Sequence, residues 1–440
     1  MGHLREIKRE HAELVRRLAA GSVALPEPKN EHAWKGWRDI LEILFSPEEA
    51  SLAVRLPVFP ASLEVLAQRT GTAPHDLRVK LDAMCDKGLV IDLVHPETGA
   101  VKYALAPPVV GFFEFSMMRA SDSVPKKRLA EALEAYTRFD DEFAREVFGT
   151  ETVVGRALVH ESAWGDEGDE VPSDVLDWER ATAILSDATS HAVSLCYCRH
   201  KADHLGHACD AEAENCLSIN MGADFVLRRG FGRAINKTEA LEILHRSREH
   251  GLVQIADNVL DRPAYVCNCC GCCCGQLQGI NDYDLAAVNP SGFVPTVDLA
   301  KCKGCSRCSR VCPVTAVSMS AQRVQAHRKN ALKPHIDTDR CIGCGVCADA
   351  CKAEAMRMVR GTERASVPKN RVEQMLRMAM ERGRLGNLLF DEGAGRGSRF
   401  LHQVFQALVK LPTAQKVLAS EQVRSRFVSF ALRATAGNGY

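Results

Sequence analysis

The chain has 440 residues, and its 56 Lys and Arg residues balance 56 Asp and Glu residues, so the formal net charge is zero. This balance provides no overall field that would attract nucleic acid or an anionic membrane, and a composition of 46% apolar and 25% charged residues excludes wholesale disorder. Cysteine is the exception, because 18 of the 19 cysteines lie between Cys196 and Cys351. We therefore expect the chemistry of the protein in that region.

The cysteines point to metal binding. Neighbours such as Cys269 and Cys270 fit a disulfide framework poorly, because adjacent thiols cannot easily reach separate partners. The first residues, MGHLREIKREHAELVRR, have no apolar segment or cleavage site typical of a secretory signal, and no run of 18 apolar residues occurs. We therefore expect a cytoplasmic protein whose thiolates are free to bind iron or zinc.

The predicted elements begin with helices over residues 4–18 and about 34–45, which form an N-terminal helical part (1–45). Ser46, Pro47 and Glu49 supply an N-cap, a proline at the first helical position and a capping box, so a third helix starts there. Helices over 62–69 and 74–87 then precede a hairpin of residues 89–94 and 101–105. This order resembles a winged-helix module, which covers about residues 46–107 of a domain placed at 46–120.

Apolar residues at helical spacing predict one amphipathic helix over 125–148. It falls in a helical linker domain (121–190) with a solvated acidic loop at 166–174 and a helix over 178–190. Further helices over 371–382, 400–411 and 420–432 are expected in a C-terminal helical region (361–440). With a cysteine-rich metal-binding domain (191–290) and a ferredoxin-like domain (291–360) between them, the predicted fold class is α+β and multidomain.

Two cysteine runs share the spacing C-x2-C-x2-C-x3-C: Cys302, Cys305, Cys308 and Cys312, then Cys341, Cys344, Cys347 and Cys351. In such a run three thiolates of a tight loop bind one [4Fe–4S] cluster and the fourth binds its neighbour. The sequence here resembles bacterial two-[4Fe–4S] ferredoxins over about residues 292–360, although Lys352 replaces a usual proline and residues 321–334 form a charged insertion. The crossed rule predicts one cluster on Cys302, Cys305, Cys308 and Cys351, and another on Cys341, Cys344, Cys347 and Cys312.

The ferredoxin-like region is strongly basic. Residues 291–360 contain 12 Lys or Arg and 5 Asp or Glu, an excess of seven positive charges in a neutral chain. A basic face of this kind steers acidic partners, so we expect docking of an acidic ferredoxin, a flavodoxin or an oxidoreductase subunit. Lys329 and Lys333, in the insertion, are expected to lie on that face and away from the cluster ligands.

Ten further cysteines lie upstream: Cys196, Cys198, Cys209, Cys216, Cys267, Cys269, Cys270, Cys272, Cys273 and Cys274. They suffice for two four-thiolate sites with two thiols left over, and the alternation of side chains in an extended strand predicts that the run 267–274 serves two centres. One or two additional iron–sulfur clusters are the favoured interpretation. Alternatively, Cys196, Cys198, Cys209 and Cys216 form one structural zinc site. Among these cysteines, His200, His204 and His207 are further candidate ligands.

Residues 46–360 as a whole resemble a family of proteins from anaerobic bacteria that combine a winged helix, a cysteine-rich region and a 4Fe-4S dicluster domain. The resemblance rests on the winged-helix pattern and on four segments: Cys196-Tyr197-Cys198-Arg199, Cys216-Leu217-Ser218, Gly230-Phe231-Gly232-Arg233, and the run from Cys267 to Gly275. It implies iron–sulfur electron transfer and nothing finer about a substrate.

The leading hypothesis is therefore an iron–sulfur electron-transfer protein, or the electron-transferring subunit of an oxidoreductase. Two alternatives are a redox-sensing winged-helix regulator and a reductase that binds substrate at a cluster of the cysteine-rich domain. Residues 48–105 carry six basic and eight acidic side chains, so the module lacks the basic surface that DNA binding requires. No catalytic residue is predicted, and both a monomer and an oligomer remain open.

Overall fold

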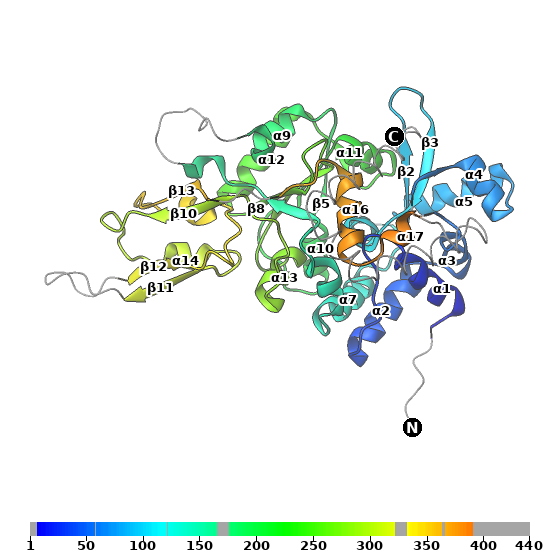
Figure 1. Cartoon of the computed structure of the whole chain (residues 1–440), viewed down its shortest axis with the longest axis horizontal. Helices are drawn as coiled ribbons and strands as arrows, with labels where there is room; N and C mark the ends of the chain where they lie inside the picture. The colour runs from blue at the N-terminus through cyan, green and yellow to red at the C-terminus, as the bar shows by residue number, and fades with distance from the viewer. Residues whose placement is uncertain are drawn as a thin grey trace, which may run out of the picture. The chain divides into compact units, whose positions relative to one another are not determined.

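The structure is a computed structural model that describes residues 7–57, 59–120, 122–164, 176–321, 332–362 and 366–389 (Figure 1). The chain mixes helices and strands and divides into two compact units. The first unit comprises Met1–Ser116, Ser123–Thr152 and Pro368–Tyr440, and the second comprises Met117–Asp122 and Val153–Val367. Within the described ranges, no helix has both the length and the apolar character needed to cross a membrane.

The first unit begins with three helices, α1 (Arg9–Leu18), α2 (Glu31–Leu44) and α3 (Pro47–Ala53). The capping box predicted for α3 is present, because Ser46 Oγ accepts from the Glu49 amide at 3.2 Å and the Ser46 amide donates to the Glu49 carboxylate at 2.9 Å. Helix α2 packs closely on α7 (Lys126–Arg138): a Cβ added at Gly36 would lie 2.5 Å from the Ala132 carbonyl oxygen.

A small sheet follows these helices. Strands β1 (Ala61–Ser62), β2 (Val90–Val94) and β3 (Val101–Leu105) pair antiparallel in the order β1-β3-β2. Helices α4 (Leu63–Thr70) and α5 (Pro74–Asp86) lie between β1 and β2 in the chain. The β2–β3 hairpin forms a long finger, drawn in cyan (Figure 1). The predicted helices and hairpin of this region agree with these elements to within a few residues.

The single helix predicted over 125–148 is wrong. After the irregular turn η1 (Pro108–Phe112) and α6 (Phe113–Met117), the chain forms α7 and then a separate α8 (Glu142–Phe148). The break is at Asp140, whose carboxylate accepts hydrogen bonds from the amides of Lys29 (2.8 Å), Asn30 (2.9 Å) and Glu142 (2.9 Å). Helices α16 (Arg371–Glu381) and α17 (Leu385–Leu389) complete the described part of this unit. The helices expected at 400–411 and 420–432 and the acidic loop at 166–174 lie outside the described residues.

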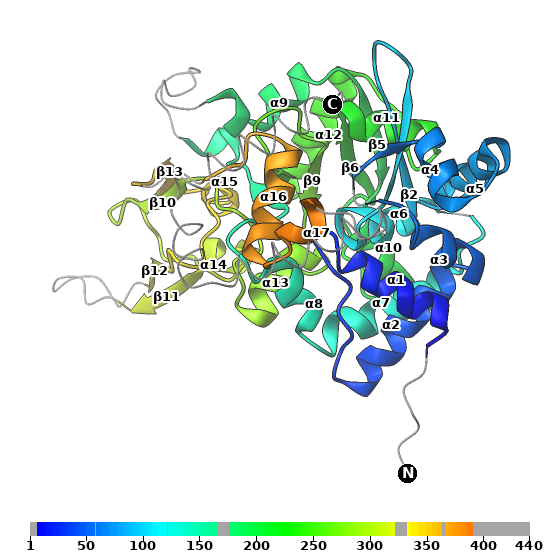
Figure 2. The same cartoon turned by 45° about the vertical axis from the view of Figure 1, so that its right-hand side comes forward.

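The second unit contains a six-stranded antiparallel sheet in the order β4-β8-β9-β6-β5-β7. Its strands are β4 (Gly155–Ala157), β5 (His191–Leu195), β6 (Glu214–Ile219), β7 (Arg233–Ala234), β8 (Val253–Asp257) and β9 (Tyr265–Cys269). Helices α9 (Ala181–Asp187) and α12 (Lys237–Glu249) lie side by side and bury an apolar core against the sheet (Figure 2). The helix expected over 178–190 is shorter than predicted, since the single turn η3 (Asp177–Glu179) precedes α9 and β5 begins at His191.

The remaining elements of this unit lie around the cysteines. They are η2 (Glu161–Trp164), α10 (Tyr197–His204), α11 (Asn220–Arg228) and α13 (Gly275–Tyr283). Residues 293–360, which we call the dicluster module, contain β10 (Phe293–Val297), α14 (Arg307–Val311), β11 (Val317–Ala321), β12 (Leu332–Ile336), α15 (Val346–Asp349) and β13 (Met356–Arg360). Strand β10 pairs with β13 and β11 with β12, both antiparallel, so the two cysteine runs alternate with short paired strands.

Candidate metal centres

The second cysteine run gathers around one cavity of the dicluster module. The cavity wall includes the last cysteine of the first run together with three of the second: Cys312, Cys341, Cys344 and Cys347. This is the grouping that the crossed rule predicts for one cluster. Cys351 packs with Cys308 against a shared apolar cluster that includes Phe293 and Met356, and its role as a ligand of the first run's cluster stays a prediction.

The two runs differ in exposure. Cys305 is exposed and Cys302 and Cys308 are half-buried, whereas Cys344 and Cys347 are each only 8% exposed. Burial raises the pKa of the Cys344 thiol to about 12 and also raises that of Cys347. Because metal ligands must be deprotonated, these two thiols need a cationic group beside them to become thiolates.

The loop of the second run packs tightly on neighbouring segments at two glycines. Gly343 (φ +69°) and Gly345 (φ +85°) both have positive φ, which side chains other than glycine rarely adopt. A Cβ at Gly343 would lie 2.3 Å from the Phe293 carbonyl oxygen. The backbone therefore follows the tight path that close approach to a cluster requires, and the residues present fit the group.

A wholly buried histidine fastens this loop to the sheet. The His160 amide donates to the Cys344 carbonyl oxygen at 3.0 Å, and its ring bonds Asp349 of α15 at 2.8 Å and the Leu252 carbonyl oxygen at 3.0 Å. His160 could not be predicted from the sequence, because it lies 92 and 189 residues before Leu252 and Asp349 and in no recognisable motif.

Strand register explains why several upstream cysteines meet. Leu217 of β6 lies opposite Val266 of β9, and both belong to the core beneath α9 and α12. Because successive side chains of a strand point to opposite faces, Cys216 and Cys267 point away from that core, and the same register places them opposite each other. Cys269 lies two residues further along β9 and shares their face.

Two helix starts add three more thiols to this face. Cys196 and Cys274 are the N-cap residues of α10 and α13, and Cys198 lies in the first turn of α10. The thiols influence one another in a continuous series, which we call the six-thiol group: Cys196, Cys198, Cys274, Cys269, Cys267 and Cys216. Helix N-termini carry partial positive charge, and hydrogen bonds from Cys198 and Cys269 lower the pKa of the Cys274 thiol to about 5. The pKa of Cys267 is lowered as well, whereas neighbouring thiols and burial raise the pKa of the other four thiols, which therefore need a bound cation to become thiolates.

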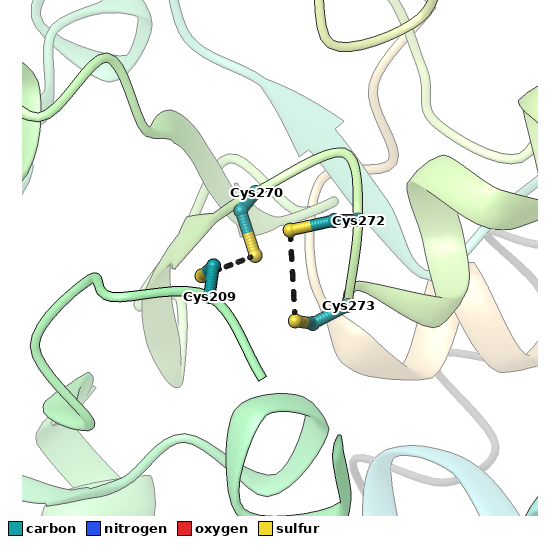
Figure 3. A group of neighbouring side chains, drawn as sticks. All are labelled: Cys209, Cys270, Cys272 and Cys273. Atoms are coloured by element: carbon teal, nitrogen blue, oxygen red, sulfur yellow. Dashed lines mark hydrogen bonds between the residues drawn. The ribbon is translucent and has the colours of Figure 1, made fainter. Parts of the chain in front are cut away.

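The other four upstream cysteines form a separate, tighter set, the four-thiol group: Cys209, Cys270, Cys272 and Cys273. Their sulfur atoms all lie within 4.8 Å of one another, with 3.6 Å between Cys209 and Cys270 and 3.6 Å between Cys272 and Cys273 (Figure 3). Cys209 comes from the loop between α10 and β6, and the other three come from the turn between β9 and α13 (Figure 3).

A buried arginine lies between the two thiol groups. Arg199 is 2% exposed and donates to the carbonyl oxygens of Glu212, at 2.8 Å, and of Asn268. The charge of its guanidinium stabilises the charged forms of Cys270 and Cys267. A hydrogen bond from Cys273 and the charge of Arg199 lower the pKa of the Cys270 thiol to about 4, although burial opposes this.

The structure groups the upstream residues differently from the zinc site considered above. Cys209 lies with the turn after β9, whereas Cys196, Cys198 and Cys216 belong to the six-thiol group. None of the three histidines is in the four-thiol group. His200 bonds the Met117 carbonyl oxygen at 2.6 Å and His204 at 3.2 Å, and His207 is exposed.

The expectation that Lys333 lies away from the cluster ligands is wrong. The residue is 6% exposed, and its ammonium group donates to the carbonyl oxygens of Leu299 (2.7 Å) and Cys302 (2.9 Å). A single lysine here satisfies two carbonyls of the loop that carries the first cysteine run. Lys329 lies outside the described residues.

Comparison with known protein families agrees with the spacing of the two runs. Residues 295–352 match the model of a 4Fe-4S dicluster domain, which supports an iron–sulfur protein. No curated protein and no solved structure matches the chain. The dicluster domain and the cysteine-rich site together fit iron–sulfur electron transfer.

Proposed function

We propose that the chain is an electron-transfer protein of the cytoplasm, acting by itself or as a subunit of an oxidoreductase, and that it passes single electrons from a docked partner to the cysteine-rich region. The observation that carries the proposal is the meeting of Cys312 with Cys341, Cys344 and Cys347 inside a segment that matches a 4Fe-4S dicluster domain. Two adjacent [4Fe–4S] clusters supply carriers for single electrons.

The first cysteine run is the proposed port for the partner. Cys305 is exposed, and the exposed basic residues Lys301, Lys303 and Arg310 are close to it in the chain. The Arg310 side chain bonds the Cys305 carbonyl oxygen at 3.2 Å, so its charge is held at this site. Exposed positive charge steers an acidic protein towards the site and is screened over about 8 Å at physiological ionic strength.

The cluster expected on Cys312 and the second run is the proposed internal electron carrier, because the residues around it pack against the cysteine-rich region. A Cβ at Gly271 would lie 2.5 Å from the Pro313 carbonyl oxygen, next to Cys312. Asn281 of α13 donates to the same oxygen at 2.9 Å. Arg340 strengthens the contact by bonding the carbonyl oxygens of Val314, at 2.6 Å, and Ile280, at 3.0 Å.

The six-thiol group is the proposed site of a further iron–sulfur centre. A single tetrahedral ion takes four ligands, so six thiols at one place favour a polynuclear centre or a four-thiolate cluster with two thiols beside it. Arg199 offsets part of the negative charge that such a centre and its thiolates carry. The thiols are free of disulfides, as an iron–sulfur site requires.

The proposal is tested with full-length protein purified without oxygen. A reduced acidic ferredoxin or flavodoxin should reduce it within a rapid-mixing experiment, with uptake of more than one electron per chain. Cys312→Ser should change the electron paramagnetic resonance signal of the buried cluster, and Cys351→Ser that of the cluster on Cys302, Cys305 and Cys308. Protein that carries iron and sulfide but accepts no electron from these donors would contradict the proposal.

The docking port has its own test. Charge reversal at Lys301 and Lys303 should slow reduction at low salt, and rising salt should remove the difference. Lys237→Glu is the matched control, because Lys237 is equally exposed but begins α12, outside the dicluster module. Equal rates for the port variants and the control, at every salt concentration, would show that the partner docks elsewhere.

We also propose that residues 46–107 form a winged helix that contacts protein and not DNA. The net charge of −2 over residues 48–105 is the observation that supports this reading. Sequence-selective DNA binding at physiological salt, abolished by charge reversal at Arg78 and Lys80, would instead support the redox-sensing regulator.

A further inference from the structure

The spacing of the four-thiol group is that of ligands around one ion. A zinc ion bound to four thiolates has Zn–S bonds of about 2.3 Å, so tetrahedral geometry separates neighbouring sulfur atoms by about 3.8 Å. Two pairs in this group are 3.6 Å apart, and all four sulfur atoms lie within 4.8 Å of one another. The thiols therefore need little movement to enclose a single ion.

The dicluster module provides a comparison within the same chain. Each thiolate of a cubane binds a different iron, so its four sulfur atoms lie further apart than four sulfurs on one ion. All eight cysteines of the dicluster module belong to the described residues, and they form no set with sulfur atoms as close as those of the four-thiol group. The four-thiol group thus differs in size from the cluster sites beside it.

We propose that Cys209, Cys270, Cys272 and Cys273 bind one structural zinc ion. Four thiolates leave no open position on a tetrahedral ion, which is typical of structural and not catalytic zinc. This proposal is independent of electron transfer, and it differs from the zinc site suggested by the order of cysteines in the sequence. Only Cys209 is common to both sets.

A zinc ion at this site would link two segments that lie far apart in the sequence. It ties the loop between α10 and β6 to the turn between β9 and α13, two segments separated by about 60 residues (Figure 3). The same turn carries Gly271, which packs on Pro313 of the dicluster module. It also carries Cys270, whose charged form Arg199 stabilises. Zinc would therefore fix the position of the dicluster module against the six-thiol group.

The test is metal analysis of the full chain, purified without oxygen or chelators from cells supplied with both metals. We expect one zinc per chain. Cys209→Ser and Cys273→Ser should each reduce zinc at least tenfold and leave iron and acid-labile sulfide unchanged. Cys267→Ser is the matched control in the six-thiol group, and it should keep the zinc. Hydrogen exchange of residues 205–213 should accelerate only in the zinc-depleted variants.

X-ray absorption at the zinc edge tests the wild-type protein without any variant. Four sulfur neighbours at about 2.3 Å are expected. Wild-type protein without zinc, nitrogen or oxygen ligands at the zinc edge, or loss of about four iron and four sulfide in Cys209→Ser would each overturn the proposal. Because none of these measurements involves a redox partner, failure of the zinc site and failure of the electron-transfer function are distinguishable.

Discussion

The ion pair between Glu179 and Arg360 holds the last strand of the dicluster module against the segment before α9. Both guanidinium ends of Arg360 bond the carboxylate, at 2.6 Å and 2.7 Å, and the side chains are only 17% and 4% exposed for Arg360 and Glu179. The guanidinium also lies 4.1 Å from the ring centre of Phe293 in the partner strand β10. Removal of the carboxylate in Glu179→Ala therefore leaves a buried positive charge without its bidentate anionic partner, beside the ring of Phe293.

The expected cost follows from this burial. Removal of one partner from a buried ion pair costs about 3–5 kcal/mol, because the other charge stays desolvated. The cation–π contact retains about 1 kcal/mol, so we expect the lower end of that range, about 3 kcal/mol. Such a loss increases the equilibrium constant for local opening of the β10–β13 sheet roughly a hundredfold.

Amide hydrogen exchange of β10 and β13 is the appropriate assay, since a chain with two units does not unfold in one two-state step. Glu214→Ala is the control: it removes an exposed ion pair with Arg233 in the same unit, with exposed fractions of 42% and 49%. Exposed pairs contribute less than about 1 kcal/mol. The double variant Glu179→Leu, Arg360→Met should recover most of the wild-type protection against hydrogen exchange, because apolar residues can replace a buried ion pair. Equal, small effects of Glu179→Ala and the control would refute the reasoning.

Three further predictions concern other parts of the chain. Asp140→Asn should destabilise the first unit by about 1 kcal/mol at pH 7, because the carboxylate accepts three backbone amides. Burial would raise the pKa of Asp140, but these hydrogen bonds outweigh it and lower the pKa. The stability that Asp140 contributes is therefore present above the unfolded pKa of about 3.9 and is lost as pH falls through the folded value. Urea unfolding from pH 3 to 7 should show that the stability difference between wild type and Asp140→Asn shrinks in acid. Gly345→Ala should remove about half of the dicluster iron, because this position has φ +85° and an added Cβ would lie 3.1 Å from Ala163 and His160. Gly99→Ala is the control: Gly99 has φ +67°, but an added Cβ would have no neighbour within 4 Å, so the metal content should not change. Arg199→Gln should lower iron retained by the six-thiol group after gel filtration, and an unchanged iron content would argue against charge compensation there.

Local signals predicted the elements whose stabilising contacts are local. The capping box at Ser46 located α3 because its two hydrogen bonds lie within four residues. The break between α7 and α8 could not be predicted in this way. The apolar pattern continues through 125–148, and the chain is interrupted by hydrogen bonds from Lys29 and Asn30, which lie about 110 residues away.

The same distinction applies to the metal centres. The spacing of the two cysteine runs predicts which cysteines meet, because a tight loop and a short helix determine their positions. No spacing rule covers the upstream cysteines. Cys216 meets Cys267 only because β6 pairs with β9 in one particular register, and Cys209 is separated from Cys216 because a loop carries it to another turn. Nearness in the sequence is therefore a poor guide to which of these cysteines meet.

The positive charges of the dicluster module differ in whether a carboxylate neutralises them. Lys333, Arg340 and Arg360 direct their charges inward, to carbonyl oxygens and to the buried carboxylate of Glu179. Arg340 and Arg360 are paired with the carboxylates of Asp284 and Glu179, which lie outside residues 291–360, so these two charges contribute little to a field in solution. The docking field that we propose must then come from the remaining charges, which include the exposed residues around Cys305, so the salt dependence of electron uptake should be weaker than an excess of seven charges implies. A salt dependence that matches the full excess would mean that the ion pairs of Arg340 and Arg360 are open in solution, contrary to the packing seen at Arg360.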